Sequence, residues 1–287
     1  MLYGLGIKEN ISENGIGGGT PQILLLDAAD LSPRWTANLE GVREGIFPKN
    51  AESTLSPTQL MEQGKAMHLA PGVAFAPDRD ALYVVHADSG QLTTAEFGEQ
   101  TVQTVEIHAR LNWFERLLSL TAGIAHAKVA DGTSKDVAVS PDGQFLYVVG
   151  MDTASTPDKQ GNWQLSQTPL GLEIIRTSDG SRVEHIETGA GDLFLSPDGR
   201  FLYLREWGSN MDTAPGTEVF DTSGLQIIAR KAGLYPTPAW RINGEPLLVS
   251  TYSLSETWHH MTVLQPADLS ILAEWKGPDY ISWLTIE

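Results

Sequence analysis

The sequence predicts an all-β chain folded as a β-propeller, a ring of four-stranded antiparallel blades. Three segments align without gaps, and each reads as an apolar strand, a turn containing Pro-Asp, and a second strand carrying Leu-Tyr; they cover residues 74–85, 138–149 and 194–205. The 28 glycines and 16 prolines are spread along the chain, as expected where tight turns join many short strands. A repeated supersecondary unit indicates sheets that stack on one another into a continuous core.

The Pro-Asp turn explains why each repeat begins with a hairpin. Proline fixes φ at the first turn position, aspartate accepts a hydrogen bond from its own backbone, and glycine adopts a positive φ without steric cost. Pro-Asp-Gly occupies residues 141–143 and again residues 197–199. Two further β-rich runs follow each hairpin, so one repeat supplies the four strands of a meander.

The repeats predict a single propeller domain, residues 1–287, with about five blades. Blade one combines 281–287 with 2–41, and the other blades cover 72–108, 136–188, 192–231 and 237–276. A blade built from both ends of the chain would close the ring and leave no unpaired sheet edge there. The alternative is a fragment of a longer parent with about seven blades.

Two segments, 42–71 and 109–134, do not fit the blade period. In the first, a capping box with proline at the first helical position predicts a short helix over 57–64. In the second, apolar residues at helical spacing predict an amphipathic helix over 111–121, packed as a lid on a propeller face. The loop 152–169 only partly matches a calcium loop, and we expect it to be a hairpin extension.

Composition excludes several classes of partner. Acidic residues outnumber basic ones 36 to 19, so the formal net charge is −17, and the field of the protein repels phosphate backbones and anionic lipid. We expect no nucleic acid partner and no membrane insertion, since no window approaches ~18 consecutive apolar residues. No signal peptide is recognisable. The chain has no cysteine, which removes disulfides and thiolate metal sites but leaves the compartment open.

Residues 140–149, their near copy at 196–204, and residues 76–85 resemble the YVTN-type β-propeller repeats and, more distantly, the TolB-type repeats. The resemblance covers roughly residues 72–286 and rests on hairpin and core positions, so it implies a fold without implying a chemistry. It implies a bacterial or archaeal propeller, often extracytoplasmic and often without an assigned activity. The two inserts and the low blade count depart from the family pattern.

No set of catalytic residues can be recognised. A lactonase of the gluconolactonase type would need oxygen ligands around a divalent cation, and a glycosidase would need two carboxylates across a cleft. Neither set stands out, and the Gly-x-Ser-x-Gly elbow of serine hydrolases is absent. The adjacent His259 and His260 point to opposite faces of a strand, so they cannot chelate one ion together. The sequence predicts no catalytic residue, no metal site and no cofactor.

A binding site is best placed on the face formed by the loops between blades and the loops between strands two and three, because loops on a rigid scaffold commonly carry function. Polar and aromatic residues mix there, as in a shallow ligand or peptide site. The candidate ligand-binding residues are His86, Asp88, Lys135, Asp136, Asp152, Arg205, Trp207 and Tyr252.

We therefore expect a non-catalytic binding or scaffold module that engages a protein, a peptide or a small ligand at this face. One alternative is a hydrolase, lactonase-like or carbohydrate-active, with a divalent cation at the channel mouth. Another is a structural propeller that organises an assembly.

Overall fold

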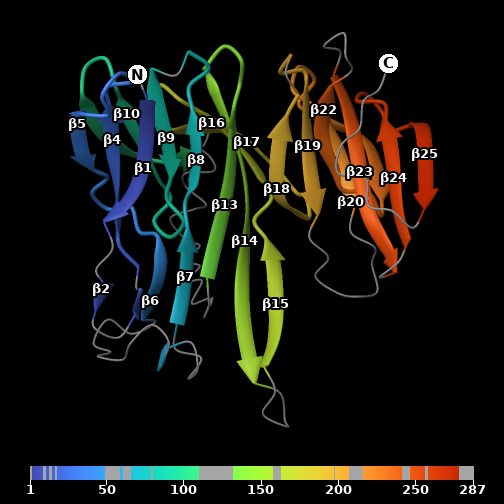
Figure 1. Ribbon diagram of the computed structural model, residues 1–287, viewed down its shortest axis with the longest axis horizontal. Coiled ribbons are helices and arrows are strands. Elements are labelled where there is room, and N and C mark those ends of the chain that lie inside the picture. Colours follow the sequence, from blue (N-terminus) through green and yellow to red (C-terminus); the bar gives the residue numbers. More distant parts are fainter. Residues whose placement is uncertain are drawn as a thin grey trace, which may run out of the picture. The chain divides into compact units, whose positions relative to one another are not determined.

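The computed structural model describes residues 2–8, 11–12, 15–16, 18–48, 59–60, 66–78, 80–109, 132–157, 163–196, 198–206, 216–240, 246–255 and 258–277. The described residues lie almost entirely in strands and turns (Figure 1). The chain divides into two compact units, Met1–Glu187 and Thr188–Glu287, each with its own sheets and core.

The first unit contains three sheets, which we number as blades one to three. Blade one has the strand order β1 (Leu2–Lys8), β4 (Thr20–Leu26) and β5 (Pro33–Asn38). Blade two comprises β8 (Gly72–Phe75), β9 (Ala81–Val85), β10 (Gln91–Glu96) and β11 (Thr101–Glu106). Blade three comprises β13 (Gly132–Val139), β14 (Phe145–Pro157), β16 (Leu172–Arg176) and β17 (Ser181–Ile186). Neighbouring strands within each blade are antiparallel. A short ribbon of β2 (Ile11–Ser12) and β3 (Gly15–Ile16) follows β1.

The second unit contains two four-stranded antiparallel meanders. Blade four comprises β18 (Ala190–Leu195), β19 (Phe201–Glu206), β20 (Gly216–Asp221) and β21 (Gln226–Ala232). Blade five comprises β22 (Pro236–Trp240), β23 (Pro246–Ser255), β24 (Trp258–Leu264) and β25 (Ile271–Gly277). The predicted fold class, an all-β chain of four-stranded propeller blades, is therefore confirmed.

Three predicted features lie wholly or largely outside the described residues. The first strand expected for blade one, 281–287, is among them, so the closure of the ring stays a prediction. Of the helix expected over 57–64, Gln59 and Leu60 are described and are helical. The amphipathic helix expected over 111–121 is not described.

The Ser-Pro-Asp-Gly turn forms the hydrogen bonds that make the hairpin recur. The Ser140 hydroxyl donates to the Asp142 carboxylate at 2.5 Å, and the backbone N–H of Phe145 donates to the Ser140 hydroxyl at 2.9 Å. The N–H of Gln144 also donates to Asp142, and Gly143 has a φ of 71°. These bonds, first that from Ser140, lower the pKa of Asp142. The same pattern recurs in blade four among Ser196, Asp198, Arg200 and Phe201.

We expect Ser140→Ala to lower the free energy of unfolding by about 2 kcal/mol, because it removes one donor and one acceptor at a buried position. Urea denaturation followed by tryptophan fluorescence measures the change. Ser178→Ala, at an exposed turn position, is the matched control and should stay within about 0.5 kcal/mol of the parent. Equal effects of the two substitutions would contradict this role of the Ser140 hydroxyl.

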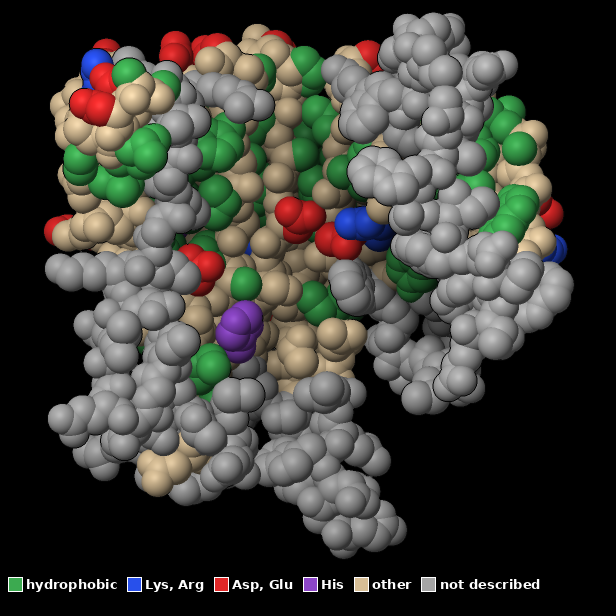
Figure 2. All heavy atoms as spheres, viewed as in Figure 1, with side chains coloured by type: hydrophobic (Ala, Val, Ile, Leu, Met, Phe, Trp, Pro, Cys, Tyr) green, Lys and Arg blue, Asp and Glu red, His purple; other side chains and the backbone are tan. Residues whose placement is uncertain are grey.

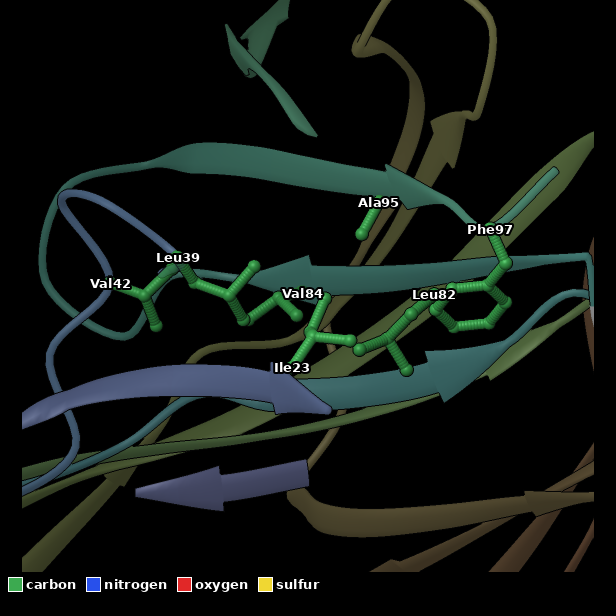
Figure 3. Close-up of a cluster of buried hydrophobic side chains, with 7 residues drawn as sticks. All are labelled: Ile23, Leu39, Val42, Leu82, Val84, Ala95 and Phe97. Carbon is green, nitrogen blue, oxygen red and sulfur yellow. The ribbon is translucent and has the colours of Figure 1, made fainter. Parts of the chain in front are cut away.

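Blade two is covered on both faces by its neighbours. On one face, Leu82 and Val84 pack with Ile23 of blade one (Figure 3). On the other face, Val85 packs in one cluster with Val137 and the other apolar residues of blade three. A sheet covered on both sides indicates blades stacked in series, because a two-layer sandwich leaves one face of each sheet to solvent. In the second unit, Tyr203 and Val219 of blade four share a core with Leu248 and Leu264 of blade five.

The insert 42–71 contributes two strands that extend blade three. They are β6 (Gly45–Pro48) and β7 (Ala66–Ala70), and β7 runs parallel to the first residues of β13. The loop 152–169 forms the predicted hairpin extension, in which β15 (Trp163–Pro169) pairs with the far half of β14 (Figure 1). We call the resulting sheet, with the order β15-β14-β13-β7-β6, the accessory sheet. A further short strand, β12 (His108–Ala109), runs parallel to β17.

Candidate functional site

The predicted site residues fall into two groups, one in each unit. His86, Asp88, Lys135, Asp136 and Asp152 lie in the first unit, around the junction of blade two, blade three and the accessory sheet. Arg205 lies in the second unit, at the end of β19. Trp207 lies outside the described residues, and Tyr252 belongs to β23 but its side chain is not described.

Lys135 stands at the centre of the first group. It lies on β13 opposite Gly150 of β14. Two glycines lie close to its stem: a Cβ added at Gly150 would lie 3.3 Å from the Lys135 Cγ, and one added at Gly72 would lie 3.3 Å from the Lys135 Cβ. The side chain is partly buried, and this burial lowers the pKa of Lys135, whereas the negative charges of Glu173, Asp152 and Asp88 act in the opposite direction.

Each of these three carboxylates is held by a donor other than Lys135. Arg43 donates to Asp88 at 3.0 Å, Thr133 donates to Asp152 at 2.8 Å, and Arg182 donates to Glu173 at 2.7 Å. Among the described residues, no carboxylate oxygen lies within 4.0 Å of the Lys135 ammonium. The ammonium is therefore surrounded by negative charge without a direct ion pair. We call Arg43, Asp88, Thr133, Lys135, Asp152, Glu173 and Arg182 the Lys135 cluster.

The cation of Arg43 is also positioned by an aromatic ring. Its guanidinium carbon lies 4.2 Å from the ring centroid of Phe47 on β6, a distance typical of a cation–π contact. Phe47 in turn lies against Gly18, where an added Cβ would be 2.3 Å from the ring. The accessory sheet thus fixes one side of the Lys135 cluster.

His86 supports the cluster from the interior. Its side chain is fully buried at 0% exposure, and its Nε2 and Nδ1 atoms hydrogen-bond to the hydroxyls of Thr93 at 2.7 Å and Ser89 at 3.0 Å. The Thr93 hydroxyl also forms a hydrogen bond with the Thr104 hydroxyl at 2.8 Å. Burial lowers the pKa of His86, so the neutral imidazole is favoured. A buried ring offers no surface to a ligand, so His86 holds the end of blade two in place.

Asp136 does not join the Lys135 cluster. Successive side chains of a strand point to opposite faces, and β13 is extended here, so Asp136 faces away from Lys135. Its carboxylate accepts a hydrogen bond from the backbone N–H of Val137 at 3.0 Å. The sequence analysis placed Asp136 and Lys135 in one site because they are neighbours in the chain. Successive side chains of β13 point to opposite faces of the sheet, so the two residues lie apart.

Arg205 in the second unit is already engaged. It donates to Asp192 at 2.5 Å, and its guanidinium carbon lies 5.5 Å from the ring centroid of Phe194. That ring stacks on Tyr203 with centroids 4.7 Å apart. The ion pair and the stacking give Arg205 a structural role within blade four.

A second charged group near Arg205 escaped the sequence analysis. Arg230 donates to both carboxylate oxygens of Glu206, at 2.8 and 2.7 Å, and lies 3.8 Å from Glu218. Thr188 donates to Glu218 at 2.5 Å. Burial is the main cause that raises the pKa of Glu218, with the nearby Glu206 adding to it.

Four of the charged residues that the sequence did not indicate lie inside strands. Glu173 and Glu218 occupy β16 and β20, and Arg182 and Arg230 occupy the outer strands β17 and β21. A charged residue within an otherwise apolar strand could have indicated them in the sequence, as Glu173 does in the Leu-Glu-Ile-Ile run of β16. Among the described residues, no group of three or more His, Asp or Glu side chains is arranged to hold a metal ion. None of the described helices is long and apolar enough to span a membrane.

The coloured face in Figure 2 shows acidic side chains at several separate places. Basic side chains lie beside some of the acidic ones on this face.

Comparison with known proteins yields structural neighbours only. No model of a known protein family and no curated protein matches the chain. Similar solved structures include hydrazine synthase from Kuenenia stuttgartiensis (14% identity, 85% of this chain and 56% of that chain, TM-score 0.45) and the periplasmic gluconolactonase PpgL from Pseudomonas aeruginosa (17%, 96% and 67%, 0.44). The Dos1 propeller is another (14%, 73% and 61%, 0.36). The chain spans only about half the length of the hydrazine synthase chain, at 56%.

Proposed function

We propose that this chain is a non-catalytic β-propeller binding module whose ligand site is the Lys135 cluster. One observation carries the proposal. Lys135 presents a partly buried ammonium without a direct ion pair among the described residues, while every carboxylate around it is held by another donor. Side chains that are positioned before a ligand arrives lower the entropic cost of binding.

The chemistry of the cluster supports a small ligand. Three donor–acceptor pairs accompany the Lys135 ammonium: Arg43 with Asp88, Thr133 with Asp152, and Arg182 with Glu173. The formal charges of three carboxylates, two guanidinium groups and one ammonium cancel, so a neutral polar ligand is favoured over an ion of either sign. A few convergent polar groups at the edge of an apolar core are typical of small-molecule sites.

The repeat pattern supports a place among the YVTN-type propellers. The Ser-Pro-Asp-Gly hairpins and the four-stranded meanders agree with it, and this assignment is part of the proposal. A bacterial protein whose partner is a small ligand, and not nucleic acid, would fit both the repeats and the net charge of −17.

We expect a panel of small neutral and charged metabolites to contain compounds that bind the parent protein and lose affinity when the cluster is changed. The panel holds amino acids, dicarboxylates, polyols, and neutral aldehydes and ketones, and ligand-observed NMR measures binding. Lys135→Met and Asp152→Asn should raise the dissociation constant by at least about tenfold, the loss expected when one hydrogen bond to a charged group is removed.

The matched control is Lys276→Met, since Lys276 is a 54% exposed lysine on β25 and should leave binding unchanged. Thermal unfolding checks that each variant is folded. The proposal fails if the variants of the cluster bind every compound as the parent does. It also fails if the purified protein carries stoichiometric calcium or zinc and turns over a lactone or a glycoside, because that result would support the hydrolase alternative.

A further inference from the structure

We infer that Lys135 forms a reversible imine with the ligand, so that the ligand class is a small neutral aldehyde or ketone. The inference rests on the proposed function, because it takes the Lys135 cluster as the binding site. It adds a covalent bond between one named nitrogen and a carbonyl carbon.

The Lys135 amine lies where it can lose its proton and react. Only a neutral amine adds to a carbonyl, so a useful lysine must lose its proton easily and must not be locked in an ion pair. Lys135 meets the second condition among the residues that the structure describes, where Asp88, Asp152 and Glu173 each accept from another donor and no ion pair to Lys135 is formed. Its burial favours the neutral form, which agrees with the first condition.

The aliphatic part of the Lys135 side chain is restrained by its neighbours. Gly150 and Gly72 both lie close to the Lys135 stem, and any larger residue at Gly150 would meet the Ser134 carbonyl oxygen at 2.6 Å. A stem held in this way loses less rotamer entropy when its terminal nitrogen reacts. Surface lysines such as Lys276 lack this restraint.

The groups around the Lys135 nitrogen carry negative charge. A protonated imine is a cation, and the carboxylates of Glu173, Asp152 and Asp88 stabilise a cation at this place in the same way as they stabilise the ammonium. The same carboxylates repel an anionic ligand, so a carboxylate or a phosphate ester is a poor candidate. A neutral carbonyl compound avoids that repulsion and becomes cationic only after it has reacted.

The reaction balances without any oxidant or reductant. The nitrogen lone pair of neutral Lys135 adds to the carbonyl carbon, and the electron pair of the C–O π bond moves to oxygen. The nitrogen then gives up one proton to water and the oxygen takes one up from water, which leaves a neutral carbinolamine with a lone pair on nitrogen. The resulting hydroxyl group is protonated and leaves as water while the nitrogen lone pair forms the C=N bond. One carbonyl group and one amine thus give one imine and one water, and hydrolysis reverses both steps.

Reductive trapping tests the inference. The full chain is incubated at pH 7.5 with glycolaldehyde or 4-hydroxybenzaldehyde and sodium cyanoborohydride, which delivers hydride to the C=N carbon and makes the bond permanent. Intact mass and peptide mapping then follow the modification of each lysine. We expect Lys135 to be modified severalfold faster than Lys276, because burial lowers the pKa of Lys135 and leaves more of its amine in the neutral form that adds to a carbonyl. Lys135→Arg, which keeps the positive charge but cannot form this imine, should lose the fast site.

The possible results separate the inference from the proposed function. Modification of Lys135 no faster than that of Lys276, while Lys135→Met still weakens binding of some compound of the panel, would overturn the imine and leave the binding site standing. Fast modification of Lys135 that is absent in Lys135→Arg supports the imine. If no compound of the panel loses affinity in Lys135→Met and Lys135 shows no selective modification, both proposals fail.

Discussion

Gly132→Ala is expected to separate β7 from β13 and to abolish the accessory sheet. A Cβ at residue 132 would lie 2.4 Å from the carbonyl oxygen of His68, which is a backbone atom of β7 and cannot turn away. Relief of this clash requires a shift of β7 or of β13, and the parallel pairing of Gly132 with His68 is lost in either case. Overpacking of this kind costs about 3 kcal/mol in the free energy of unfolding.

The same substitution should also disturb ligand binding, because Thr133 follows directly and holds Asp152 through its hydroxyl. Chemical denaturation measures the stability, and hydrogen exchange measures the protection of the backbone amides of β7. Gly98→Ala is the matched control, since nothing lies within 4 Å of a Cβ added there, and it should change stability by less than about 0.5 kcal/mol. Unchanged protection of β7 in Gly132→Ala would show that the strand pairing does not depend on this glycine.

The blades could be predicted because their signals are local. The hairpin of residues 140–145 is determined by bonds among neighbours, such as that from Ser140 to Asp142, and the same letters recur in the next blade. The strands of the accessory sheet have no such signal. β6 and β7 have four and five residues, and β7 pairs with a strand more than sixty positions later, at Gly132. Long-range pairing of short strands is not encoded in any window of the sequence.

The candidate site was predictable only in part, for a related reason. Asp88, Lys135 and Asp152 were proposed because the sequence suggested strand ends beside unusual loops, whereas Lys135 and Asp152 lie within β13 and β14. Glu173 was not proposed, because a single charged residue in the apolar pattern of β16 resembles a core strand. Asp136 was grouped with Lys135 from its neighbouring position, although the two-residue period of a strand places it on the opposite face. The burial of His86 depends on how blade two packs, which the sequence does not reveal.

His86→Leu is the second large effect that we expect. The substitution keeps much of the volume, but it leaves the buried hydroxyl of Thr93 and the hydroxyl of Ser89 without the ring nitrogens that they contact. Loss of both hydrogen bonds inside the first unit should cost about 3 kcal/mol at pH 8. His108→Leu, at an exposed position, is the matched control and should cost less than about 0.5 kcal/mol.

The loss in free energy of unfolding caused by His86→Leu should become smaller as the pH falls. This direction follows from the lowered pKa of His86 in the folded state. Burial lowers the pKa of His86 in the folded state below the unfolded value of 6.5, so the unfolded chain binds the proton more readily. The stabilisation from neutral His86 is complete above pH 6.5 and is lost progressively as the pH falls through the lowered folded-state pKa.

Glu44 and Glu218, whose folded-state pKa values are raised by burial, change stability in the opposite direction, but they do so equally in the parent and in the variant. The difference between the two proteins therefore isolates His86, and urea denaturation at pH 8 and pH 5 measures it. A difference that stays constant between these pH values would mean that the imidazole does not resist protonation in the folded state.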